Sequence, residues 1–352
     1  MEAVRILLIL VILVIFIYVM ARLLAKREKI LSMKTIEGLT TAAEADINNL
    51  KKKYPLMNSI KNITPERSQM PLAQYCIKGS YNSAYSGTVL SGDAIKYVLS
   101  RGCRALDLEI ADDVENGVSV IYSKGGETVG KNKASLVDIF SAISANAFFS
   151  GNTPNPEDPL FIYLRIKMSR GVYDKVAAII SEQFAKSRRY INVNGNAKPT
   201  NGSTMLKDIK SKVIFLMDKT VNPSWASDSS RLTKYINAEV GGTSWKMQSY
   251  GDIVNQAIDP PTLSDNFKST NLYNEIILRP DNLEIYPTPR ITDTIMNYGI
   301  QILLLRYYVY DEGMILNEDL FDTFKTGILP MAYAIQYSKQ SNVELKENKI
   351  VY

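Results

Sequence analysis

The chain has 352 residues, a length that suits one large domain or two ordinary ones. Apolar residues make up 46% of it and charged residues 22%, which excludes a disordered or low-complexity protein. Histidine is absent from the whole sequence, so no mechanism here can use an imidazole as base, acid or metal ligand.

The net charge of +5 is carried by the N-terminal part of the chain. Residues 1–70 contain 11 basic and 6 acidic residues, whereas the remainder contains 30 of each. Because a nucleic-acid-binding body is normally basic itself, this distribution favours a membrane surface and predicts no nucleic-acid partner. Two cysteines, Cys76 and Cys103, make no disulfide framework and are expected to be buried thiols in a reducing compartment.

Residues 6–21 form an unbroken apolar run that continues, past Arg22, to residue 25. Because Arg5 and Arg22 can reach the headgroups, residues 5–25 are long enough to cross a lipid bilayer. A cleaved signal peptide and a buried core helix are the alternatives, and the residues around Met20 make a poor cleavage site. We therefore predict a transmembrane helix within residues 1–25.

The flanks of this run set its expected orientation. Basic residues after it outnumber those before it, so the positive-inside rule places the body of a single-pass membrane protein on the cytoplasmic side. Residues 26–70 are expected to form a helical stalk or linker, because apolar residues recur at spacings of three and four between Ile36 and Leu50. The pair Tyr54-Pro55 is expected to end this helix.

Beyond Pro71, short apolar runs alternate with helical stretches. We expect helices over residues 92–101, 135–148 and 172–186, and strands over residues 75–79, 103–110, 118–122, 160–167, 213–218, 245–250, 283–286 and 299–308. A doubly wound sheet shares this rhythm, but eight strands in this length suit a (β/α)₈ barrel. We predict an α/β fold with a TIM-like barrel over residues 71–337, followed by a C-terminal tail over residues 338–352.

In such a barrel, chemistry belongs to polar residues at the carboxyl ends of the strands and in the loops that follow them. The candidates are Asn82, Asp107, Glu109, Ser123, Arg165, Lys212 and Tyr286. Asp107 and Glu109 alternate along one strand, so both point to the same face. Two carboxylates inside a barrel require a cation, and a metal ion and a basic side chain are both open at this point.

Several segments, in order, resemble the catalytic barrel of phosphoinositide-specific phospholipase C. Residues 71–85 (PLAQYCIKGSYNSAY), 101–109 (RGCRALDLE) and 120–125 (VIYSKG) are similar to its first half. Residues 285–287, 290, 297–301 and 327–330 are similar to its second half, so the resemblance covers roughly residues 70–337. It implies a barrel fold and an ancestral cleavage of inositol phospholipids that uses two histidines and a calcium ion.

The resemblance places Tyr81 and Ser123 where the family has its catalytic histidines. It places Asn82, Asp107 and Glu109 on calcium ligands, and Arg165 on the remaining carboxylate ligand. A phenol and a serine hydroxyl accept protons poorly at neutral pH, and acid–base catalysis contributes about 10²–10⁴-fold. The resemblance therefore implies no catalytic residue, cofactor or metal; we hypothesise that Arg165 takes the metal's electrostatic place.

These observations predict a catalytically inactive, phospholipase-C-like protein that tethers a membrane to protein partners in a larger assembly. A virion whose minor capsid protein is anchored in an inner membrane is one such assembly. One alternative is a module that binds a phosphoinositide, an inositol phosphate or another phospholipid headgroup through Arg165, Lys212 and Tyr286. The other is a divergent phosphodiesterase that works without histidine.

Overall fold

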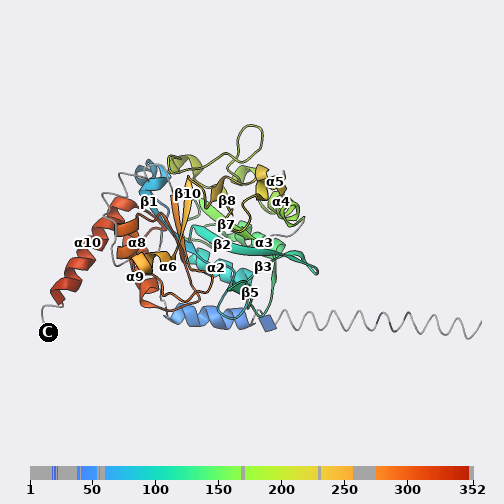
Figure 1. The fold of residues 1–352 in the computed structure, drawn as a ribbon, viewed down its shortest axis with the longest axis horizontal. Helices are drawn as coiled ribbons and strands as arrows, with labels where there is room; N and C mark the ends of the chain where they lie inside the picture. Colours follow the sequence, from blue (N-terminus) through green and yellow to red (C-terminus); the bar gives the residue numbers. More distant parts are fainter. Residues whose placement is uncertain are drawn as a thin grey trace, which may run out of the picture.

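The computed structural model describes residues 60–167, 171–228, 231–256 and 275–348, together with residues 18, 20, 22, 38–39, 41–53 and 55 nearer the N-terminus. Its centre is a β-sheet surrounded by helices (Figure 1). The predicted transmembrane helix lies outside the described residues except for Tyr18, Met20 and Arg22. Within the described part of the chain, no helix combines the length and the apolar character needed to span a bilayer.

Eight strands form the sheet at the centre of the molecule. They are β1 (Tyr75–Ser80), β2 (Ala105–Asp113), β7 (Leu160–Ile166), β8 (Val213–Asp218), β9 (Ala238–Val240), β10 (Trp245–Ser249), β11 (Glu275–Arg279) and β12 (Ile302–Leu305). Each strand pairs in parallel with the next, and β12 pairs in parallel with β1. The sheet therefore closes on itself, and the predicted TIM-like α/β barrel is confirmed.

Five further strands lie outside the barrel. β3 (Gly117–Ile121) pairs antiparallel with β2 and with β6 (Ala134–Ser135), and β13 (Ile328–Pro330) pairs antiparallel with β1. β4 (Ser123–Lys124) and β5 (Glu127–Thr128) form a short antiparallel pair. The segment predicted over residues 118–122 is thus a strand. It pairs with the outer part of β2 and is not one of the eight strands of the barrel.

Helices connect the strands and cover the outside of the barrel (Figure 1). Those described are α2 (Gly92–Ser100), α3 (Leu136–Asn146), α4 (Val172–Gln183), α5 (Trp225–Asp228), α6 (Tyr250–Gln256), α8 (Ile291–Tyr298), α9 (Glu312–Phe324) and α10 (Met331–Asn348). Short 3₁₀ helices are η1 (Glu66–Ser68), η2 (Leu72–Gln74), η3 (Lys186–Arg188), η4 (Leu206–Ile209) and η5 (Leu232–Lys234). Side-chain caps fix two helix starts: Ser91 accepts from the Ala94 amide before α2, and Asp311 accepts from the Met314 amide before α9.

Side chains alternate between two apolar layers along the barrel strands. On β7, Phe161 and Tyr163 belong to the interior cluster, whereas Ile162 and Leu164 belong to the layer under the helices. Along β11, likewise, Ile277 belongs to the interior cluster, whereas its neighbours Ile276 and Leu278 belong to the layer under the helices. Both faces of each strand are therefore buried, which is why these strands read as nearly continuous apolar runs in the sequence.

One expected strand fails in the barrel's second half, and two strands there were not predicted. Residues 283–286 form a loop after β11, in which Asp281 Oδ1 accepts from the Leu283 amide at 3.1 Å and Glu284 adopts a φ of 51°. The alternation of apolar and polar residues there reflects a loop with exposed Leu283 and Ile285. The missing barrel strands are β9 and β11, which the sequence pattern did not predict.

A helix over residues 41–53 packs along the lower edge of the barrel in Figure 1. Its apolar stripe is buried at Ala43, Ile47 and Leu50, of which Ile47 and Leu50 join the barrel's outer core. Asp46 Oδ2 accepts from Ser86 Oγ at 2.7 Å and from Thr88 Oγ1 at 2.6 Å, in the loop after β1. This part of the predicted stalk therefore docks on the outside of the barrel, and Asp46 contacts a loop at the barrel's carboxyl end.

The segment predicted as a C-terminal tail continues a helix. α10 begins at Met331, directly after β13, and runs to Asn348. Ser338, where the tail was predicted to begin, is fully buried.

Candidate functional site

The acidic pair and the arginine singled out by the sequence lie side by side at the carboxyl end of the barrel. Asp107 and Glu109 are on β2 and Arg165 is on β7, where Glu109 and Arg165 are directly paired positions. Asn82 lies in the loop that follows β1. These four side chains come from three neighbouring strands, as the barrel topology predicts for a site.

Arg165 is held by a fork of hydrogen bonds. Its Nε and Nη2 donate to the two oxygens of Asp107 at 2.7 and 2.9 Å, and Nη2 also donates to Asn82 Oδ1 at 2.6 Å. Its Nη1 lies 3.3 Å from Glu109 Oε2. Burial would lower the pKa of Arg165, but the nearby Asp107 carboxylate and Tyr81 hold it well above its usual range. The guanidinium therefore stays charged and compensates both carboxylates.

The loop after β1 is fixed on this ion pair by the backbone. The Asn82 amide donates to Asp107 Oδ2 at 2.8 Å, and Asn82 itself adopts a φ of 44°. Ser83 and Asp107 exchange two further bonds, from the Ser83 amide to the Asp107 carbonyl and from the Asp107 amide to Ser83 Oγ. Asparagine tolerates this left-handed backbone conformation better than most residues, so its identity suits the loop as well as the site.

Tyr81 and Ser123 are both engaged by this cluster. The Arg165 guanidinium lies 4.7 Å from the centre of the Tyr81 ring, a cation–π arrangement. Burial raises the pKa of Tyr81 to about 12, although Arg165 acts in the opposite direction, so the phenol is protonated at neutral pH. Ser123 Oγ donates to Glu109 Oε1, and Lys167 Nζ lies 3.3 Å from the same oxygen. Neither position offers a free proton acceptor.

A cavity of about 250 Å³ opens beside the cluster. Tyr81, Glu109, Ser123 and Arg165 contribute to its wall, together with residues that the sequence analysis missed: Gly126, Lys167, Thr220, Val221, Arg279 and Asn282. Lys167 follows Arg165 by two positions and so could have been expected on the same side of the chain. Arg279 ends β11, a strand that was not predicted, so its place at the cavity had no sequence signal.

A second group of polar side chains adjoins the cluster on the side of β12. Tyr308 donates to both oxygens of Glu284 at 3.1 Å, and Tyr122 donates to Glu284 Oε2 at 3.3 Å. The Tyr85 ring stacks on Tyr122 with their centres 4.2 Å apart. Burial raises the pKa of Glu284, against the effect of these hydrogen bonds and of Arg306. Sequence reasoning did not identify Glu284, which lies in the segment predicted as a strand.

Two predicted site residues lie elsewhere. Lys212 precedes β8, at the amino end of the barrel, and its Nζ donates to the Ser187 carbonyl at 2.6 Å. Its assignment to the pocket was wrong, because a residue before a parallel strand lies at the end opposite the site. Tyr286 is in the loop after β11 at the correct end, but it does not line the cavity; it packs against Gly251 and accepts from Asn255 at 3.4 Å.

The donor set does not fit a calcium ion. Both oxygens of Asp107 and one of Glu109 face Arg165, the other Glu109 oxygen faces Ser123 and Lys167, and Asn82 Oδ1 accepts from Arg165. A cation placed among these oxygens would meet the guanidinium at close range. Among the described residues, no group of three or more acidic or cysteine side chains is arranged to hold a metal.

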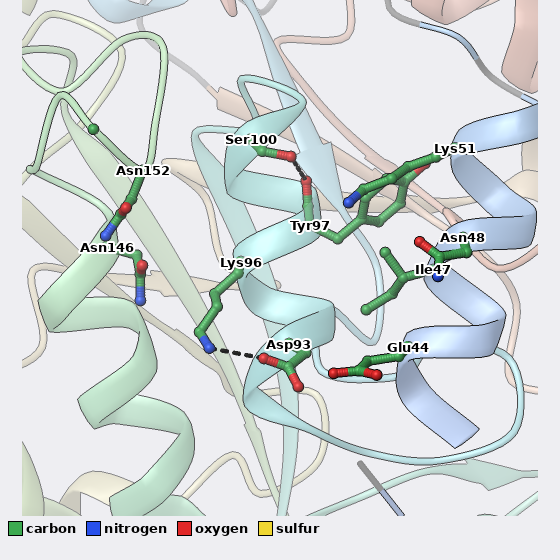
Figure 2. A pocket seen from close by; sticks show the side chains of 11 residues that line it. Glu44, Ile47, Asn48, Lys51, Asp93, Lys96, Tyr97, Ser100, Asn146 and Asn152 are labelled. Carbon is green, nitrogen blue, oxygen red and sulfur yellow. Dashed lines mark hydrogen bonds and ion pairs between the residues drawn. The ribbon is translucent and has the colours of Figure 1, made fainter. Parts of the chain in front are cut away.

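A larger cavity, of about 520 Å³, lies outside the barrel between the helix 41–53 and the helices α2 and α3 (Figure 2). In Figure 2, Glu44 of the first helix lies beside Asp93 of α2, whose carboxylate pairs with Lys96 at 2.7 Å. The lining mixes both charge signs and includes none of the sequence-predicted site residues. The barrel cavity is therefore the candidate functional site.

Comparisons with known proteins support the fold described above. Residues 68–219 match the family model described as phosphatidylinositol-specific phospholipase C, X domain. The body of this chain is a phospholipase-C-like barrel. The X-domain match contains every residue of the ion-paired cluster, from Asn82 to Arg165.

Solved structures agree on the fold. The barrel is similar to the crystal structures of PLC21 from L. pealei (18% identity, TM-score 0.57) and from S. officinalis (17% identity, TM-score 0.58). The similarity covers 75% and 76% of this chain but only 37% and 38% of the two PLC21 chains. The chain thus spans well under half of the length of these proteins. Among curated protein sequences, none matches the chain.

Proposed function

We propose that this protein is a catalytically inactive phospholipase-C-like barrel that acts as a membrane-anchored structural or tethering module. The observation that carries the proposal is the engagement of Arg165 by Asp107, Glu109 and Asn82, where the family resemblance implies a calcium site. The chain has no histidine to supply acid–base catalysis, and Tyr81 stays protonated at neutral pH. On this proposal the barrel keeps the shape of the enzyme without the histidine chemistry that the resemblance implies.

A turnover assay tests the inactivity. The full-length chain, in detergent, would be incubated with phosphatidylinositol with and without calcium, beside an active phospholipase C as positive control. We expect no release of inositol phosphate above background in either condition, and no rise in Tm on adding calcium. Turnover that disappears in Arg165→Ala would contradict the proposal and support a divergent phosphodiesterase instead.

The anchoring part of the proposal rests on residues 5–25, an apolar run flanked by arginines. We expect the full-length chain to stay with membranes in alkaline carbonate, and a variant lacking residues 1–25 to be released. Added protease should degrade the body in lysed cells, where the cytoplasmic face of the membrane is accessible. It should spare the body in intact cells. Carbonate release of the full-length chain would refute a transmembrane anchor.

The tethering part of the proposal concerns a protein assembly on the cytoplasmic side, such as a capsid tied to an inner membrane in a virion. A neutral barrel without catalytic groups suits a role in which shape and surface are used. Cross-linking of the protein in its native membrane, followed by identification of the joined peptides, should give contacts between the barrel surface and a second protein. Cross-links confined to lipid and to the chain itself would contradict a tether.

A second candidate function is the binding of a phosphorylated headgroup. Lys167 and Arg279 line the barrel cavity and are not fully neutralised: Arg279 Nη2 lies 4.0 Å from Asp218, and Lys167 is about one third exposed. Titration with inositol phosphates tests it, with Arg279→Gln as the variant and Lys175→Gln, a surface lysine away from the cavity, as the control. Micromolar binding lost only in Arg279→Gln supports a headgroup module; no binding at high micromolar ligand removes it.

A further inference from the structure

The connection between α4 and β8 contains many more basic than acidic residues. Residues 186–212 contain seven basic residues and one acidic residue, a net charge of +6, although residues 71–352 are neutral as a whole. The connection ends where β8 begins, at Val213, whereas the cavity residues Thr220 and Val221 follow the end of β8. A six-residue strand spans about 20 Å, so the two regions lie at opposite ends of the barrel.

Hydrogen bonds tie separate parts of this connection to one another and to Lys234. Arg188 Nη1 donates to the Ser211 carbonyl at 3.5 Å, and Lys212 Nζ donates to the Ser187 carbonyl at 2.6 Å. The Ala197 amide donates to the Lys234 carbonyl at 2.7 Å, which brings another lysine beside the connection. We call Lys186, Arg188, Lys198, Lys207, Lys212 and Lys234 the basic surface.

Most of the charge on the basic surface is not neutralised. Lys186, Lys198, Lys207 and Lys234 are exposed, and within the described residues no carboxylate lies within 4 Å of their ammonium groups. The neighbouring Lys210 does have a partner, Glu157, at 3.6 Å. The positive potential at this end of the barrel is therefore available to an external anion.

Aromatic rings orient several cations here. Arg188 lies 4.8 Å from the centre of the Phe148 ring, and Lys198 lies 5.2 Å from that of Tyr190. The adjacent Arg189 lies 5.2 Å from the Tyr235 ring. Cations held in this way lose less side-chain freedom when they bind an anion than free lysines and arginines would.

We propose that the basic surface binds the phosphate backbone of a nucleic acid without reading its sequence. An acidic protein partner is disfavoured because protein interfaces have an apolar centre, and Val193 is the one large exposed hydrophobic residue described in residues 186–212. The rest of the connection offers exposed side-chain amides that can bond to phosphate, among them Asn194 and Asn196. The proposal departs from the expectation of no nucleic-acid partner, which rested on the neutral charge of the whole body.

The number of cations in the basic surface sets the expected affinity for a nucleic acid and the dependence of that affinity on salt. Contacts with five to seven phosphates give a slope of log K against log salt of about −3.5 to −5 for a single strand. Sequence-independent binding of this kind has a Kd of roughly 10⁻⁴–10⁻⁶ M at physiological salt. The basic surface lies apart from the barrel cavity, so this binding is independent of the function proposed there.

Fluorescence anisotropy of the full-length chain in a nonionic detergent, with a labelled 20-nucleotide oligo-dT, tests the proposal. The variant Lys186→Glu/Lys198→Glu/Lys207→Glu reverses three exposed charges of the basic surface. Its control, Lys96→Glu/Lys124→Glu/Lys131→Glu, reverses three exposed lysines elsewhere and changes the net charge equally. We expect micromolar binding at 50 mM salt, at least tenfold weaker in the first variant and within twofold of the parent in the control.

A labelled 20-residue polyglutamate, tested in parallel, separates the classes of partner. Weaker binding of polyglutamate than of oligo-dT supports the nucleic-acid proposal. Equal or tighter binding of polyglutamate would assign the basic surface to an acidic protein and overturn the proposal. An absence of oligo-dT binding, or an equal loss in both triple variants, would overturn it as well.

Discussion

Arg165 makes the electrostatics of the barrel cavity depend on a single side chain. Its guanidinium contacts Asp107 in a bidentate manner, Glu109 through an ion pair and Asn82 through a hydrogen bond, while its own face covers Tyr81. Arginine has the planar fork that this geometry needs, and lysine would satisfy one partner at a time. The residue thus has a structural task whether or not the cavity binds a ligand.

Arg165→Met tests that task. The substitution leaves the buried Asp107 carboxylate without a cation and leaves Glu109 with Lys167 alone, so we expect the free energy of unfolding at pH 7 to fall by about 3–5 kcal/mol. Adding Asp107→Asn to Arg165→Met removes the stranded charge and should recover part of the loss. Urea unfolding of the two variants measures both effects. A double variant no more stable than Arg165→Met would indicate a packing defect instead of an electrostatic one.

Asp113 gives stability a pH dependence at the turn between β2 and β3. Hydrogen bonds from Ser119 Oγ at 2.6 Å and Asn116 Nδ2 at 3.0 Å lower its pKa to about 2. Since the folded pKa is below the unfolded value of about 3.9, this stabilisation is present above pH 4 and is lost as the pH falls toward 2. We expect Ser119→Ala to raise the pKa of Asp113, as measured by carboxyl NMR titration. Ser144→Ala, on α3, is the control; equal shifts in both variants would contradict the assignment.

At the scale of elements, the helix 41–53 is held on the barrel by few polar contacts. Asp46 accepts three hydrogen bonds from Ser86 and Thr88, including one from the Thr88 amide at 3.1 Å. Ile47 and Leu50 provide the apolar contact. Asp46 therefore fixes where the helix meets the loop after β1, and that loop carries Asn82 and Tyr85 into the site.

Asp46→Ala should loosen this helix selectively. Loss of hydrogen bonds to a charged acceptor costs about 1.5–3 kcal/mol, and the cost falls on local opening of residues 41–53. Hydrogen exchange of amides in the helix should become faster by tenfold or more, with β7 and β8 unchanged. Glu312→Ala, which removes an exposed ion pair with Arg290 away from this helix, should leave all of these rates unchanged. Uniform acceleration in the barrel strands would show that the helix is part of the global folding unit.

Strands were predictable from the sequence where a long apolar run fitted no other kind of element. β7 and β8 are continuous apolar segments and were located to within a residue, because both of their faces are buried. β9 has three residues, Ala238-Glu-Val, too few to show a period. The loop around Glu284 alternates like a strand, but its backbone turns where Glu284 adopts positive φ and meets Tyr308.

The candidate site was predictable to the same extent as the strands that support it. Asp107, Glu109 and Arg165 lie on predicted strands, and their pairing follows from the charge that a buried carboxylate requires. Arg279 lies on an unpredicted strand and could not be placed. Lys212 was misplaced because it precedes β8 and so lies at the amino end of the barrel, opposite the site.

At the scale of the molecule, the barrel closes where its first and last strands meet, and a buried charge cluster lies outside that closure. Glu318 of α9 contacts Lys78 of β1 at 2.8 Å and Arg101, after α2, through its Nε at 2.9 Å. Tyr307, after β12, donates to the same carboxylate. Burial would raise the pKa of Glu318, but the two cations hold it below its usual value. One carboxylate therefore joins the beginning and the end of the barrel.

Glu318→Leu should accordingly weaken the whole molecule and not one element. Lys78 would remain buried without the carboxylate that it contacts, and Arg101 would lose its ion pair with Glu318, so we expect a loss of about 3–5 kcal/mol and faster exchange in every barrel strand. The triple variant Lys78→Met/Arg101→Met/Glu318→Leu removes the stranded charges together and should recover most of that loss, because apolar replacements of similar volume avoid the desolvation cost. Denaturant unfolding of the two variants measures the difference. A triple variant no more stable than Glu318→Leu would mean that the closure depends on the shape of these side chains and not on their charge balance.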